Sequence, residues 1–98
     1  MTAAKALLWA REALESENYT VNDPHFYDRM KLRGMFWPDA QGVIESPSQV
    51  RTDGTDQFGR ERWFFKGITT AKSEVEILIV FEDDGSGSVI FWTIYWDE

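Results

Sequence analysis

The sequence predicts an α+β domain in which N-terminal helices pack on a three- or four-stranded, mainly antiparallel sheet. Two observations predict this class. Apolar residues recur at helical spacing up to about residue 45, and from Val50 onward they alternate with polar residues, as strands require. Of the 98 residues, 43% are hydrophobic and 15% aromatic, which is enough for one core. We therefore expect a single domain over residues 1–98, with an N-terminal helix and a connection in residues 1–22.

Three helices are expected in the first half of the chain. The first runs from about Thr2, a suitable N-cap, to about Glu17. Asn22-Asp23-Pro24 predicts the start of the second, because a capping side chain precedes a proline at the first helical position. Gly34 ends that helix. A short third helix starts at Trp37-Pro38-Asp39 and stops before Ser46-Pro47.

The second half alternates with the period of strands. A short strand is expected near residues 49–52, followed by a turn-rich loop over residues 52–61. Three longer strands follow, namely RWFFKG (62–67), EVEILIVFE (74–82) and SVIFWTIYW (88–96). Both faces of the 74–82 segment are partly apolar, which favours a central strand.

Charge limits the functions that the chain can have. The formal net charge is −7, and it is unevenly distributed. Residues 1–23 carry two basic and four acidic side chains, residues 24–73 eight and six, and residues 74–98 none and seven. Anion binding is therefore expected only in the middle of the chain. Without cysteine and with one histidine, neither a metal site nor a cofactor is predicted. No signal or membrane segment is apparent, so we expect a cytoplasmic protein without membrane contact.

The helix over residues 24–33 carries the first candidate site. His25, Arg29 and Arg33 follow each other at intervals of four residues, so they share one helix face. Histidine as acid or base and two guanidiniums would suit a phosphate and its transition state. The alternative is structural, with the arginines paired to carboxylates or packed on the sheet.

A second basic group lies on the 62–67 strand and just before it. Arg60, Arg62 and Lys66 share one strand face with Phe64. Cations beside an aromatic ring are typical of surfaces that bind single-stranded RNA. The alternative is a solvent-facing strand whose charges discourage edge pairing.

The five tryptophans indicate a different class of function. Alternation along the last strand predicts that Trp92 and Trp96 share one face with Ile90 and Ile94. Tryptophan is a favoured anchor at protein interfaces, so this strand is a candidate homodimer face or partner-binding groove. A tightly filled small core is the alternative explanation.

A motif in the second helix carries a resemblance to a known family. His25-x3-Arg29-Met30-x2-Arg33-Gly34-Met35 is followed by Asp39-Ala40, Val43-Ile44, Pro47-x2-Val50 and a Gly59-Arg60 turn. Over residues 23–96 this pattern resembles a small bacterial domain-of-unknown-function family with a His-x3-Arg-Met-x2-Arg-Gly signature, allied to the RelE, ParE and BrnT toxins.

The resemblance implies a RelE-like fold and metal-independent cleavage of messenger RNA by a toxin that an antitoxin holds inactive. It makes His25, Arg29, Arg33 and Tyr95 the catalytic candidates. The chain departs from such toxins at its end, where Asp97 and Glu98 stand in place of a cation. Two functions therefore remain open: an RNA-cleaving toxin or a degenerate relative of one, and a non-catalytic, acidic protein-interaction module on the same scaffold.

Overall fold

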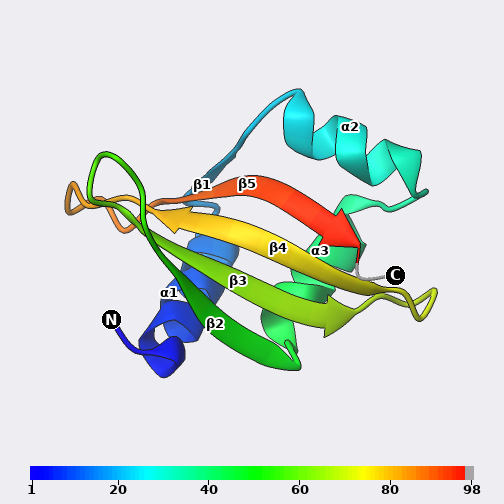
Figure 1. Ribbon diagram of the computed structural model, residues 1–98, viewed down its shortest axis with the longest axis horizontal. Helices are drawn as coiled ribbons and strands as arrows, with labels where there is room; N and C mark the ends of the chain where they lie inside the picture. The colour runs from blue at the N-terminus through cyan, green and yellow to red at the C-terminus, as the bar shows by residue number, and fades with distance from the viewer. Residues whose placement is uncertain (97–98) are drawn as a thin grey trace.

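The fold combines three helices with one five-stranded sheet, and the computed structural model describes residues 1–96. The helices are α1 (Ala3–Glu15), α2 (His25–Leu32) and α3 (Trp37–Glu45). The strands are β1 (Tyr19–Val21), β2 (Gln49–Thr55), β3 (Glu61–Ile68), β4 (Glu74–Phe81) and β5 (Val89–Trp96). Figure 1 shows them side by side in the order β1-β5-β4-β3-β2, with α1 and α3 behind the sheet. The predicted α+β class is confirmed.

The sheet has one strand more than expected and is mixed. From β2 to β5 each strand runs antiparallel to the next, as predicted. The additional strand is β1, which pairs in parallel with β5, so that Tyr19 lies opposite Val89 and Val21 opposite Phe91. We expected only a connection there, because three residues are too few to show alternation. The strand forms through its pairing with residues far along the chain.

The helix ends follow the predicted capping residues closely. The side chain of Thr2 accepts a hydrogen bond from the backbone N–H of Lys5 at 3.2 Å, which caps α1 as expected. Gly34 follows α2 with a φ of +65°, a conformation that glycine adopts without strain. The start of α2 is one residue later than predicted, at His25, and no side chain caps it.

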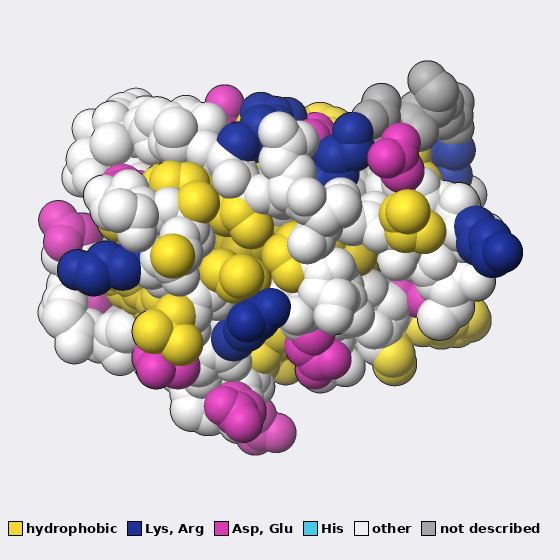
Figure 2. Space-filling model, turned by 90° about the horizontal axis from the view of Figure 1, so that it is seen from below, with side chains coloured by type: hydrophobic (Ala, Val, Ile, Leu, Met, Phe, Trp, Pro, Cys, Tyr) yellow, Lys and Arg dark blue, Asp and Glu magenta, His cyan; other side chains and the backbone are white. Residues whose placement is uncertain are grey.

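The core lies between α1, α3 and one face of the sheet. Ala6, Ala10 and Ala13 form the buried side of α1, and their small side chains let this helix pack closely. The sheet contributes its largest side chains to the same core, including Trp63, Phe65, Ile77, Ile79, Phe81, Phe91 and Ile94. Figure 2 shows the molecule from below the view of Figure 1. On that surface, hydrophobic side chains gather in the middle and charged side chains lie around them.

The opposite face of the sheet, which we call the open face, points away from α1 and α3 (Figure 1). The pairing register places two rows of side chains across it. In one row Arg51, Phe64, Leu78 and Thr93 follow each other from β2 to β5. In the next row the order is Gln49, Lys66, Glu76 and Tyr95. The open face thus mixes aromatic rings with both signs of charge.

Helix α2 lies beside β5 at the edge of the sheet (Figure 1). Because β1 pairs only with residues 89–91, no strand of residues 1–96 lies beside the rest of the β5 edge. The backbone N–H and side-chain amide of Asn22 donate to the carbonyls of Phe91 and Trp92 at 2.9 and 3.2 Å. Phe26 and Met30 of α2 are buried in the core. The helix therefore closes an edge that would otherwise invite pairing with another chain.

None of the three helices in residues 1–96 is both long and apolar enough to cross a membrane.

Close packing of α3 on β3 at Gly67 gives a first prediction. A Cβ atom there would lie 3.0 and 3.2 Å from the two methyl carbons of Val43. We expect Gly67→Ala to lower the free energy of unfolding by about 1–3 kcal/mol, because the packed core resists added volume. Gly42→Ala is the matched control, since a Cβ there meets nothing within 4 Å. In a helix interior it should instead stabilise by up to about 1 kcal/mol. Urea unfolding measures the free energy of unfolding of both variants. If Gly67→Ala leaves it unchanged, α3 does not pack closely on β3 at Gly67.

Candidate functional site

The open face brings the two predicted groups of site residues together. Phe64 of β3 and Tyr95 of β5 have ring centroids 6.0 Å apart. The guanidinium of Arg29 lies 5.5 Å from the Tyr95 ring, and that of Arg51 lies 4.4 Å from the Phe64 ring. A cation therefore stands at each end of a pair of aromatic rings. Sequence spacing predicted these groups separately, because only the register of the sheet makes them neighbours.

The helical stripe of α2 makes specific contacts with β5. The Nε2 atom of His25 lies 2.8 Å from the hydroxyl oxygen of Thr93. Arg29 donates from Nε to the carbonyl of Ile94 at 2.7 Å. The guanidinium of Arg33 lies 5.3 Å from the ring of Trp96. These contacts hold α2 against the last strand of the sheet.

The cations of the open face and its adjoining loop are paired with carboxylates. Arg62 and Lys66 share the predicted strand face with Phe64, and Arg60, which precedes β3, lines the same cavity as Arg62. The nitrogen–oxygen distances are 2.8 Å for Arg51–Glu76, 2.8 Å for Arg60–Asp56, 2.9 Å for Arg60–Glu82, 3.0 Å for Arg62–Asp53 and 3.8 Å for Lys66–Glu74. The positive charge that the sequence concentrates on this strand is thus largely neutralised where it stands.

The loop between β2 and β3 is organised around Asp56. Its carboxylate accepts hydrogen bonds from the backbone N–H groups of Phe58 and Arg60, both at 2.9 Å, and from Nε of Arg60 at 2.8 Å. Desolvation opposes ionisation of this carboxyl. The hydrogen bonds and the charge of Arg60 outweigh it, so the pKa of Asp56 lies below its ordinary value. The loop therefore has a fixed shape that depends on an ionised aspartate.

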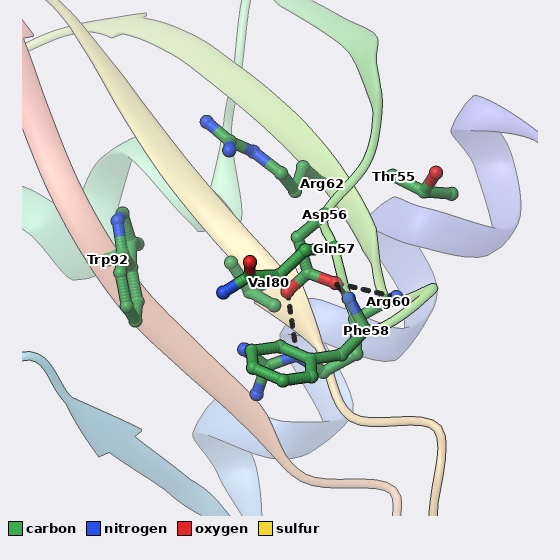
Figure 3. A pocket seen from close by; sticks show the side chains of 8 residues that line it. All are labelled: Thr55, Asp56, Gln57, Phe58, Arg60, Arg62, Val80 and Trp92. Atoms are coloured by element: carbon green, nitrogen blue, oxygen red, sulfur yellow. Dashed lines mark hydrogen bonds and ion pairs between the residues drawn. The ribbon is translucent and has the colours of Figure 1, made fainter.

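A cavity of about 390 Å³ opens between this loop and β5. Figure 3 shows its lining side chains, with Trp92 on one side and Phe58 on the other. Val80 of β4 lines it, and Arg60 and Arg62 add two guanidinium groups. The sequence predicts separate sites for Arg62 and Trp92 and no role for Phe58. The signal that could have identified Phe58 is that it is the aromatic residue within the otherwise polar loop predicted over residues 52–61.

The prediction that Trp92 and Trp96 share one face of the last strand is wrong. The register shifts between Leu78 and Ile79, so that Leu78 pairs with Thr93 but Ile79 pairs with Phe91. Trp92 is the extra residue of this β-bulge, and it lines the cavity together with Arg62. Trp96 instead packs against the core beside α2. The two candidate interface residues therefore lie on opposite faces of the sheet.

Tyr95 is 43% exposed on the open face. Asp97 and Glu98, which mark the departure from RelE-type toxins, lie outside the described residues. Within residues 1–96, His, Asp and Glu side chains form no group of three that is arranged to hold a metal ion.

Comparisons with models of known protein families, with curated proteins and with solved structures find no match for this chain. The resemblance to the RelE-allied family therefore stays a prediction.

The docking of α2 gives a second prediction. Arg29→Met removes the hydrogen bond to the Ile94 carbonyl and the cation–π contact with Tyr95. We expect it to lower the free energy of unfolding by about 1–2 kcal/mol. Lys31→Met, at an exposed position of the same helix, should stay within about 0.5 kcal/mol of wild type. Urea unfolding measures both variants, and equal effects would exclude a docking role for Arg29.

The Asp56 network gives a third prediction. A carboxyl with a depressed folded-state pKa adds stability above its unfolded value, here 3.8, and loses that contribution as the pH falls through the folded-state pKa. Asp56→Asn should therefore be less stable than wild type at neutral pH, and the difference should shrink as the pH is lowered to about 3. Urea unfolding across this range tests it. A difference that does not vary with pH would mean that ionisation of Asp56 is irrelevant to the loop.

Proposed function

We propose that this domain is a protein-interaction module, without catalytic activity, that binds its partner through the open face. One observation carries the proposal: the strand cations of the open face are paired with carboxylates, while aromatic side chains beside them stay exposed. Trp92 is 38% exposed and Tyr95 43%. This arrangement suits a protein surface better than a polyanion.

Electrostatics argue against RNA as the main ligand. Affinity for phosphates comes largely from lysine and arginine side chains that release counterions. Here Arg51 already forms two hydrogen bonds to the carboxylate of Glu76, at 2.8 and 3.0 Å. Binding a phosphate would break such pairs and bring a polyanion toward a chain with a net charge of −7.

The same surface is well suited to a protein. Tyrosine and tryptophan supply much of the binding energy at interfaces, because they bury a large area at little cost in side-chain entropy. Tyr95 and Trp92 project from a strand in a sheet, so their positions are set before binding. The ion pairs around them form a polar rim that can stay hydrated.

A RelE-like RNA-cleaving toxin is a second candidate, favoured by one feature of the geometry. Arg29, Tyr95 and Phe64 stand in a row on the open face, and His25 lies beside Thr93, two residues before Tyr95 on β5. In this function the rings would stack on bases, and His25, Arg29 and Arg33 would act on the phosphate. An antitoxin would then be the protein partner.

Controlled expression separates the two candidates and gives a fourth prediction. We expect normal growth of a bacterial host that makes abundant soluble wild-type protein, because an interaction module does not cleave messenger RNA. The Arg29→Ala, Arg33→Ala variant is induced in parallel, with soluble protein quantified in both. Growth arrest by the wild type alone, at matched soluble levels, would establish the toxin and refute the interaction module.

A direct binding measurement supports that comparison. Fluorescence anisotropy with a labelled single-stranded RNA at low salt should give no saturable binding. Co-purification of a tagged chain from its own host should recover a protein that a Trp92→Ser, Tyr95→Ser variant loses. The Leu8→Ser variant, which changes an exposed residue of α1, should retain it. Analytical ultracentrifugation of the purified chain measures its self-association. The result shows whether the recovered protein is a second copy of this chain.

A further inference from the structure

The cavity beside Trp92 is one part of a longer groove. A second hollow, of about 410 Å³, shares Phe58 and Arg60 with it and continues to Glu82, Asp83 and Asp84. The groove therefore begins at an aromatic ring on β5, passes Phe58 and reaches the loop between β4 and β5. Its two ends differ in chemistry.

The end at Trp92 holds the apolar side chains of the groove, beside the guanidiniums of Arg60 and Arg62. Val80 is 3% exposed, and Phe58, at 71% exposed, stands on the other side of the cavity from Trp92 (Figure 3). The guanidinium of Arg60 lies 5.3 Å from the Phe58 ring, which ties that ring to the network of Asp56. A largely exposed ring, Phe58, and a partly exposed one, Trp92, beside a buried aliphatic side chain are suited to receive one large apolar side chain.

The other end is acidic. Five carboxylates and two guanidiniums surround the groove, so the sum of their formal charges is −3. The residues are Asp53, Asp56, Glu82, Asp83, Asp84, Arg60 and Arg62. The guanidiniums are paired with Asp53, Asp56 and Glu82. Asp83 and Asp84 are exposed, and neither forms an ion pair with a cation of residues 1–96. Their negative charge is available to a ligand.

Both loops that form the groove are held in place before anything binds. The Asp56 hydrogen bonds fix the β2–β3 loop. On the β4–β5 loop, the carbonyl of Gly87 accepts a hydrogen bond from the indole N–H of Trp9 at 2.7 Å. The carbonyl of Ser86 accepts one from the side-chain amide of Asn18 at 2.9 Å. Binding would therefore cost little ordering of the protein.

We propose that this groove binds a peptide segment in which an apolar or aromatic side chain stands next to lysine or arginine. The apolar side chain enters between Trp92 and Phe58, and the cation meets Asp83 and Asp84. This inference rests on the proposed protein-binding function, and it specifies the anchor point and the chemistry of the partner. Charge complementarity selects this occupant, because a nucleic acid or a second copy of this acidic chain would bring further negative charge to the groove.

A selection of random peptides displayed on phage tests the proposal with the intact chain as bait. Enriched peptides should combine an aromatic or large aliphatic residue with lysine or arginine. Synthesised as free peptides, they should bind Trp92→Ser about 30-fold more weakly than wild type, since an anchor residue is lost. Asp83→Asn, Asp84→Asn should also bind more weakly, and this loss should diminish at high salt. The Leu8→Ser variant should bind like wild type.

Circular dichroism and thermal unfolding of each variant exclude loss of fold as the cause. Peptides that bind Trp92→Ser as well as wild type, or that are enriched in Asp and Glu, would overturn the proposal, and so would the recovery of no binding peptide. Peptides that depend on Tyr95 but not on Trp92 would overturn the groove assignment while leaving the open face as a protein-binding surface. Cleavage of RNA by the chain, or growth arrest caused by that cleavage, would instead refute the proposed protein-interaction function itself.

Discussion

The unpaired edge of β5 is the constraint on which much of this structure depends. β1 covers only the first three residues of that strand, and backbone groups at a sheet edge either find partners or recruit another chain. Asn22 donates hydrogen bonds to the carbonyls of Phe91 and Trp92 on this edge. Arg29 donates one to the carbonyl of Ile94, which it reaches because α2 lies against the edge. That position also brings Phe26 and Met30 into the core and Arg29 to the margin of the open face. A residue that looks catalytic in the sequence thus has a structural task whatever else it does.

Pairing of charges then decides what the open face is able to bind. In the sequence, the segment over residues 24–73 has an excess of two basic side chains, which favours an anion. In the fold, Glu74, Glu76 and Glu82, from the acidic C-terminal segment, lie beside those cations. The local field is therefore close to neutral over the strands and negative at the β4–β5 loop, where Asp83 and Asp84 are exposed. In the proposed function, aromatic rings are the main source of binding energy on this face.

Local signals in the sequence predicted the elements better than their arrangement. Thr2 and Gly34 marked helix ends because capping depends on a few neighbouring residues. The alternation after Val50 predicted all four strands of the antiparallel part. β1 was missed because three residues become a strand only through a partner some 70 positions away. The same limit applies to the candidate site. Residue spacing identified Arg29 and Phe64 as site residues, but both contact Tyr95 only because of the register of three strands, which spacing does not reveal.

The β-bulge at Trp92 shows how one extra residue changes which side chains of β5 reach each face of the sheet. Strict alternation would have put Thr93 and Tyr95 toward the helices and Ile94 and Trp96 outside. The extra residue reverses that order, so Ile94 is fully buried and Tyr95 stands beside Phe64. Because both alternating sets of β5 are rich in large apolar residues, the pattern alone cannot locate the shift. Packing decides it: Ile94 fills the core opposite Ile77, and the polar Thr93 reaches His25 of α2. The place of Tyr95 beside Phe64 on the open face is a consequence of that choice.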